Sequence, residues 1–156
     1  MCDSNKKKIT LAELYPVIRE RLDVGGTVEL PITGTSMLPL LVWGRDSVDI
    51  QKTKTPKKGD IIFYRRDNGQ FVLHRIVGQN ENGFILCGDN QWDKEYGIQS
   101  RHIIAAVAAV NRRGKKIGTD NNGYKLYSFL WVKILPIRKY VLIFMRKAKR
   151  LFGAKN

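Results

Sequence analysis

The sequence is poor in the residues that build disulfide frameworks and metal centres. Its 156 residues include two cysteines and two histidines. Cys2 lies at the start of the chain and Cys87 within an apolar run, and neither belongs to a spaced pair. This usage disfavours a disulfide scaffold and a zinc site. We therefore expect no metal or cofactor, and a reducing compartment.

Long apolar segments are also missing. Residues 1–8 are polar and basic, and charges recur throughout residues 9–22, so neither a secretory signal peptide nor an N-terminal transmembrane anchor is expected. The apolar stretches on either side of Pro136 are each shorter than the roughly 20 residues that a membrane-spanning helix needs. The expected location is the cytoplasm or the periphery of a membrane.

Acidic residues are scarce: 14 stand against 28 basic residues, which gives a net charge of +14. The basic excess is concentrated near the C-terminus, where aromatic and aliphatic residues share residues 124–152 with lysines and arginines. Such a mixture predicts helices lying on an anionic membrane surface, with a helix docked on the rest of the protein as the alternative. Nucleic acid is disfavoured, because the cations accompany aliphatic bulk and form no readout motif.

Hydrophobic patterning divides the chain into three parts. Residues 1–26 contain apolar residues at helical spacing over 9–22, with Thr10 or Ser4 as a cap. Residues 27–113 contain short strand-like runs separated by turns, which predicts a mainly β domain, a compact antiparallel barrel or sandwich. Residues 114–156 form a basic, hydrophobic tail that is expected to be made of amphipathic helices.

The stretch Gly34-Thr35-Ser36-Met37-Leu38-Pro39 predicts a tight, exposed turn at the end of a strand. Such a turn can present a serine hydroxyl on a rigid backbone with free amides beside it. Acyl transfer needs this combination of a nucleophile and N–H groups placed where an oxyanion forms. Most turns of this composition have no catalytic role, so the stretch alone decides nothing.

Two further features could complete a catalytic site. His74 lies in a strand-like run and, by strand alternation, shares a face with Val72 and Ile76. A histidine on an apolar face is more often a structural core residue than a catalytic base. Asp89 and Asp93 follow the next strand, where either could cap backbone amides or orient a histidine as the third member of a triad.

Taken together, these sequence motifs resemble those of the type I signal peptidases, the S24/S26 serine peptidases. The resemblance rests on four ordered motifs across residues 28–110: Ser-Met-Leu-Pro at 36–39, Gly-Asp-Ile-Ile-Phe at 59–63, His-Arg-Ile-Val-Gly at 74–78, and Gly-Asp-Asn at 88–90 with Asp93. The family contains a lysine type and a histidine type, and His74 corresponds to the histidine type. Typical members carry an N-terminal transmembrane anchor, which is not expected here.

The resemblance implies a role for each matching residue. Ser36 would be the nucleophile and His74 the general base, with Asp93 preferred as the orienting acid and Asp89 as the alternative. The backbone around Ser36, including Gly34, Thr35 and Met37, would form the oxyanion hole and contact the substrate. Thr35 and Gly34 depart from the family, which often has a glycine directly before the serine and a hydroxyl residue before that.

The implied function is a serine endopeptidase that cleaves a leader, signal or propeptide from a precursor protein. Two other readings remain open. One is a non-catalytic member of the same fold that binds peptides or a membrane partner. The other is a basic β module that binds nucleic acid.

Overall fold

The N-terminal helix, α1 (Leu11–Asp23), begins directly after Thr10, whose side chain caps it. The computed structural model describes residues 10–152. The Glu13 amide donates to the Thr10 hydroxyl at 3.3 Å, and the Thr10 amide donates to the Glu13 carboxylate at 2.7 Å. This reciprocal capping box confirms the predicted helix and selects Thr10 as its cap. The other candidate cap, Ser4, lies outside the described residues.

Strands dominate the middle of the chain, as predicted. They are β1 (Val28–Pro31), β2 (Ser47–Gln51), β3 (Ile61–Arg65), β4 (Phe71–Asn80), β5 (Gly83–Cys87), β6 (Glu95–Ile98), β7 (Ile103–Arg112) and β8 (Lys115–Gly118). Short β6 and β8 were not predicted, because neither contains an extended apolar run. β8 belongs to the sheet although it falls in the range 114–156 that the sequence assigned to the tail.

All strand pairings are antiparallel, and the strand order is β1-β2-β7-β3-β4-β5-β6. β8 pairs only with the C-terminal part of β7, whereas β3 pairs with the N-terminal part of β7. Register shifts interrupt the ladder in β2, β3, β4 and β5, and such bulges increase twist and bend a sheet. Within the described chain the terminal strands β1 and β6 do not pair with each other, so the sheet is curved but not closed into a barrel. The expectation of a mainly antiparallel β fold is confirmed, without barrel closure.

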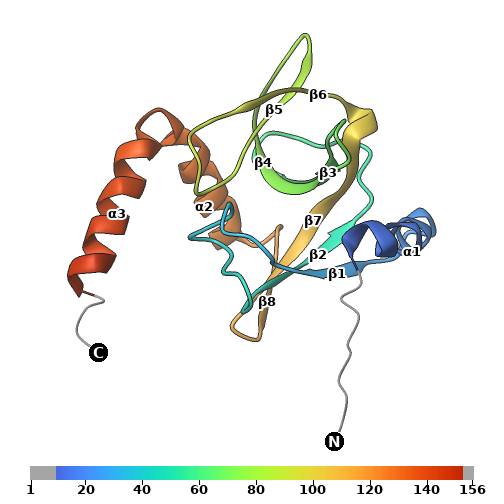
Figure 1. The fold of residues 1–156 in the computed structure, drawn as a ribbon, viewed down its shortest axis with the longest axis horizontal. Coiled ribbons are helices and arrows are strands. Elements are labelled where there is room, and N and C mark those ends of the chain that lie inside the picture. Colours follow the sequence, from blue (N-terminus) through green and yellow to red (C-terminus); the bar gives the residue numbers. More distant parts are fainter. Residues whose placement is uncertain (1–9, 153–156) are drawn as a thin grey trace, which may run out of the picture.

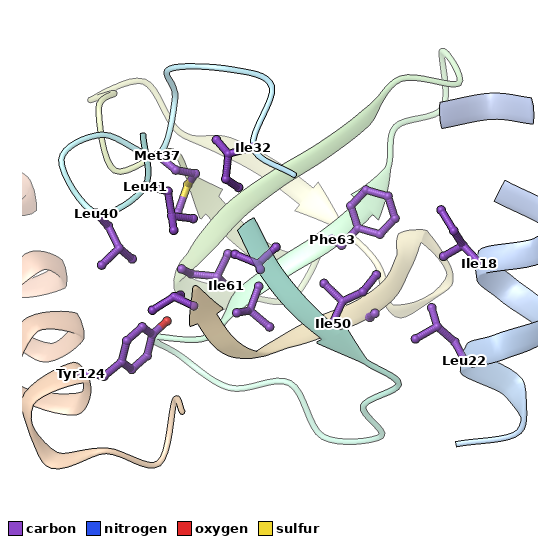
Figure 2. Close-up of a cluster of buried hydrophobic side chains, with 14 residues drawn as sticks. Ile18, Leu22, Ile32, Met37, Leu40, Leu41, Ile50, Ile61, Phe63 and Tyr124 are labelled. Carbon is purple, nitrogen blue, oxygen red and sulfur yellow. The ribbon is translucent and has the colours of Figure 1, made fainter. Parts of the chain in front are cut away.

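Each face of the sheet buries its own apolar cluster. The larger cluster packs Ile18 and Leu22 of α1, Met37 and Leu41 of the β1–β2 loop, and Tyr124 against the sheet (Figure 2). The smaller cluster is formed by side chains on the other face of the sheet. It comprises Ile62, Tyr64, Ile76, Phe84, Leu86 and Ile98. The loop that carries Ser36 is therefore attached to the main core through its own side chains.

Helices close the chain: α2 (Asn122–Lys133), the 3-10 turn η2 (Leu135–Ile137) and α3 (Arg138–Phe152), with another 3-10 turn, η1 (Ser100–His102), before β7. α1 lies at one end of the molecule and α2 and α3 at the other, with α3 running along the outside (Figure 1). Asn121 caps α2, accepting from the Gly123 amide at 2.9 Å. Among residues 10–152, no helix has the length and apolar character needed to cross a membrane.

Truncating Leu41 should destabilise the protein, because this side chain is fully buried beneath the Ser36 loop. Leu41→Ala is expected to lower the free energy of unfolding by about 2–5 kcal/mol, the usual cost of lost burial plus a residual cavity. Val17→Ala, on the exposed side of α1, is the control and should change stability by less than about 0.5 kcal/mol. Equal losses in urea unfolding would contradict the described packing.

Candidate active site

The base of the Ser36 loop is closed by hydrogen bonds to Asp46. The Ile32 amide donates to the Asp46 carbonyl at 3.0 Å, and the Asp46 carboxylate accepts from the Val42 amide at 2.8 Å and from Arg45 Nε at 2.7 Å. The hydrogen bond from Arg45, aided by the Val42 amide against the effect of burial, lowers the pKa of Asp46 to about 2. An ionised carboxylate therefore holds the loop closed over the ordinary pH range.

Ser36 lies in a tight turn, as the sequence predicted. The Leu38 amide donates to the Thr35 carbonyl at 3.2 Å, which places Ser36 and Met37 at the centre of the turn. Met37 as a whole is only 2% exposed and its side chain packs in the core, so the side chain is not open to the predicted substrate contact. Within residues 10–152 neither the Ser36 nor the Met37 amide donates a hydrogen bond, so neither N–H group is already paired with an acceptor of the protein.

The residues just before Ser36 are open to solvent. Gly34 and Thr35 are exposed, and a Cβ added to Gly34 would meet no atom within 4 Å. The Thr35 carbonyl accepts a second hydrogen bond, from Asn90 Nδ2 at 3.1 Å. The approach to the turn is therefore free on the side where the sequence predicted substrate contacts.

The turn after β5 holds the Ser36 loop through its backbone. The Asn90 amide donates to the Ser36 carbonyl at 2.7 Å. A Cβ added to Gly88 would lie 2.8 Å from the same carbonyl oxygen, too close for a side chain, so the contact requires glycine there. The serine box and the Gly-Asp-Asn box of the sequence are therefore in direct contact.

Asp89, one of the two predicted acids, pairs with Arg75 and not with His74. Its carboxylate accepts from Arg75 Nε at 2.8 Å and from Nη2 at 2.7 Å, and both side chains are fully buried. Arg75 Nη1 also donates to the Gly59 carbonyl and the Ser128 hydroxyl, each at 2.8 Å. Asp89 thus neutralises a buried guanidinium at the turn beneath Ser36.

Asp93, the preferred orienting acid, lies at an exposed position. Its carbonyl accepts a weak hydrogen bond from the Cys87 thiol, with Sγ and O 3.3 Å apart. In the described chain its carboxylate makes no hydrogen bond or ion pair, and nothing brings it to His74. The structure therefore places neither predicted acid beside the histidine.

The carboxylate that meets His74 is Glu95, which the sequence analysis did not single out. Glu95 Oε1 lies 3.0 Å from His74 Nδ1, and the Tyr64 hydroxyl lies 3.3 Å from the same nitrogen. Glu95 opposes Leu86 across β5 and β6, so its side chain lies on the face of the smaller apolar cluster, with Tyr64. The register between strands supplies this contact, which sequence spacing alone does not reveal.

Burial and neighbouring charges have opposing effects on the pKa of His74 and on that of Glu95. His74 is 3% exposed, and burial lowers its pKa, while the negative charge of Glu95 partly opposes that shift. For Glu95, burial raises the pKa, but hydrogen bonds from Arg66 and Tyr64 and nearby positive charge bring it below its usual value. The site therefore combines a neutral imidazole with an ionised carboxylate near neutral pH.

The carboxylate also selects the tautomer of His74. An acceptor at Nδ1 favours the proton on that nitrogen and leaves Nε2 as a lone-pair acceptor. In the described chain Nε2 makes no hydrogen bond, so it is available as a base. Arg66 steadies Glu95 from the other side, with Nε 2.8 Å from Oε2.

The structure links Ser36 to His74 through neighbouring residues. No hydrogen bond joins their side chains among the described residues. Arg75, the residue after His74, donates hydrogen bonds to the Asp89 carboxylate. The next residue, Asn90, donates from its amide to the Ser36 carbonyl. One turn therefore connects the strand of the histidine to the loop of the serine.

Comparison with known proteins gives this site no relative. No family model, curated protein or solved structure matches the chain. Across residues 10–152, no three histidine, cysteine, aspartate or glutamate side chains gather closely enough to hold a metal ion. The groups that the site offers for chemistry are the Ser36 hydroxyl, with two unpaired amides in the same turn, and the His74 imidazole, oriented by the ionised Glu95 carboxylate.

The two predicted acids should differ sharply in their contribution to stability. Asp89→Asn leaves Arg75 buried without a counter-charge and is expected to lower the free energy of unfolding by about 3–5 kcal/mol. Asp93→Asn, at an exposed position, is the matched control and should change it by less than about 0.5 kcal/mol. Urea unfolding measures both, and a larger loss in Asp93→Asn would contradict these assignments.

Proposed function

We propose that this protein is a serine endopeptidase of the S24/S26 type that removes a leader, signal or propeptide from a precursor. It works in the cytoplasm or at the surface of a membrane. The observation that carries the proposal is the buried His74, whose Nδ1 lies 3.0 Å from the Glu95 carboxylate. A core histidine needs no ionised carboxylate, whereas a general base gains orientation and a stabilised imidazolium from one.

In the proposed mechanism, His74 Nε2 takes the proton of the Ser36 hydroxyl as the serine oxygen attacks the scissile carbonyl. The amides of Ser36 and Met37 donate to the oxyanion that forms. The imidazolium, stabilised by Glu95, then protonates the leaving amine, and the acyl-enzyme remains on Ser36. A water molecule, deprotonated by His74, then attacks the ester to form a second tetrahedral intermediate. When this intermediate collapses, the acid product leaves and the imidazolium returns a proton to the Ser36 oxygen.

The proposal requires the Ser36 hydroxyl and His74 Nε2 to come within hydrogen-bond reach when a peptide binds. Catalytic hydrogen bonds are often long or misaligned before substrate arrives and shorten in the complex. The Ser36 loop packs in the larger cluster, whereas His74 lies with Tyr64 of the smaller one, so this approach is a requirement of the proposal and not a contact already made. The turn contacts from Asn90 limit adjustment of the loop to its tip.

Within the described chain, the terminal strands β1 and β6 each have an unpaired edge on which an extended peptide could bind. β1 is the terminal strand that leads into the Ser36 loop, and β6, at the other end of the sheet, begins with Glu95. A peptide that adds as a further strand gains main-chain hydrogen bonds with little dependence on its sequence. This mode suits a precursor whose cleavage region is extended.

Replacing the proposed nucleophile or base should abolish cleavage and leave the fold intact. Ser36→Ala and His74→Ala are each expected to lose activity, with Asp93→Asn as a control that retains it. The measurement compares new peptide termini by mass spectrometry in cells that make each variant, and circular dichroism checks folding. Termini unchanged in both variants would reject the peptidase and favour the non-catalytic, peptide-binding alternative.

The pH dependence of kcat/KM should report on His74. Neutral imidazole is the active form, and burial lowers its pKa, so activity should fall only at a pH below its ordinary value of about 6.5. Glu95→Gln removes the charge that favours imidazolium and should move this acid limb to still lower pH. The same change should reduce the maximal rate roughly 100-fold or more.

Asp93→Asn should leave both the acid limb and the rate in place, because its carboxylate has no contact with His74 in the described chain. An acid limb that moves to higher pH in Glu95→Gln, or an unchanged rate, would remove Glu95 from the mechanism.

A further inference from the structure

α3 exposes a band of large apolar side chains on the side that faces away from the protein. Tyr140 and Phe144 are each 71% exposed, and Ile143 lies beside them at 36%. Arg138 and Leu142, on the opposite side of the same helix, are buried. At 100° per residue, positions 140, 144 and 147 point away from positions 138 and 142. We call Tyr140, Ile143, Phe144 and Lys147 the outer face of α3.

Positive charge accompanies this outer face, and its own segment of the chain contributes no negative charge. Residues 121–152 contain no aspartate or glutamate. The exposed cations of this segment include Lys125, Lys133, Lys139, Arg146, Lys147 and Arg150. An amphipathic helix with aromatic residues and cations together matches the chemistry of an anionic lipid surface, where rings sit among headgroups and cations meet phosphates.

α2 presents a second stripe of the same character. Leu126, Phe129 and Leu130 are at least half exposed, and the Lys133 ammonium lies 5.6 Å from the Phe129 ring centre. Beside this stripe lies a cavity of about 830 Å³ whose lining includes Lys57, Lys58, Lys125 and Lys133, with Asp60 and Asp120 as its acids. Lysines therefore outnumber acids there as well.

The inner face of α3 connects the helix to the site of Ser36. Arg138 Nη1 donates to the Gly88 carbonyl at 3.2 Å, and Arg146 Nη2 donates to Asn90 Oδ1 at 3.2 Å. The Trp92 ring lies 5.8 Å from both the Lys139 ammonium and the Arg146 guanidinium. The outer face therefore belongs to a helix that directly contacts the turn beneath the serine loop.

We propose that the outer face of α3 docks on an anionic lipid bilayer and holds the Ser36 site at that surface. A second copy of the chain is a poor occupant, since it would bring the same cations against these. The docking surface does not depend on peptidase activity. Its consequence for the proposed function is that precursors already attached to the membrane are the substrates within reach.

Vesicle sedimentation of the full-length protein tests the proposal. The probes are vesicles that contain phosphatidylglycerol and vesicles of pure phosphatidylcholine. Tyr140→Ser/Phe144→Ser removes the rings, and Lys147→Glu/Arg150→Glu reverses two charges. Each is expected to weaken binding to the anionic vesicles on the order of tenfold or more, and wild type should bind the neutral vesicles far less than the anionic ones.

Matched controls separate this face from general effects of charge and hydrophobicity. Val17→Ser/Val24→Ser removes exposed apolar side chains at the opposite end of the molecule, and Lys54→Glu/Lys115→Glu makes the same change in net charge. Both should bind like wild type, and circular dichroism verifies that every variant keeps its helices.

Ser36→Ala should also bind like wild type, so loss of cleavage and loss of docking are independent results. Equal binding to neutral and anionic vesicles, or no binding to either, would overturn the proposal. An equal loss in the control variants would overturn it as well. If wild type failed to bind vesicles but bound an acidic peptide through Lys147 and Arg150, the outer face would instead be a protein-binding surface.

Discussion

The ion pair between Arg75 and Asp89 is the interaction on which the candidate site depends. Two charges removed from water persist only when their geometry is good and other hydrogen bonds support them, and here each nitrogen of the guanidinium has at least one acceptor. Asp89 accepts two hydrogen bonds from the guanidinium, which also reaches the Gly59 carbonyl and Ser128. The pair fixes the turn after β5. Asn90 of that turn donates a hydrogen bond to the Ser36 carbonyl in the serine loop.

Strand alternation explains why the histidine and arginine of one motif have separate tasks. Successive side chains on β4 point to opposite faces, so His74 enters the smaller apolar cluster while Arg75 points toward α2 and the turn at Gly88. One short run of sequence therefore supplies both a proposed base and the structural support of the proposed nucleophile. A shift of one residue in the strand register would exchange these two environments.

Local sequence signals predicted much of the fold, because they act within a few residues. The capping box at Thr10, the alternation in β1 and β2 and the turn around Ser36 each depend on near neighbours. What could not be predicted depends on contacts distant in the sequence. Barrel closure is decided by whether β1 and β6 meet, and the short strands β6 and β8 exist only because longer strands beside them offer hydrogen bonds.

The acid beside His74 is the clearest case of this limit. Asp89 and Asp93 attracted attention because they stand near a glycine turn, whereas Glu95 reaches the histidine through the pairing of β5 with β6. Strand alternation does put Arg75 on the face opposite His74, but its complete burial, which makes Asp89 its counter-charge, is visible only in the structure. The carboxylate beside His74 therefore comes from a different residue.

The contacts of Trp131 and Arg138 join the basic C-terminal segment to the sheet. The Trp131 indole donates to the Asp89 carbonyl at 3.1 Å, and Arg138 donates to the Gly88 carbonyl, so two residues of the basic C-terminal segment satisfy backbone groups of the sheet. The change in composition after β8 therefore does not separate two independently packed parts of the described chain. A nascent chain lacks these two contacts with the turn beneath Ser36 until α2 and the start of α3 have been made.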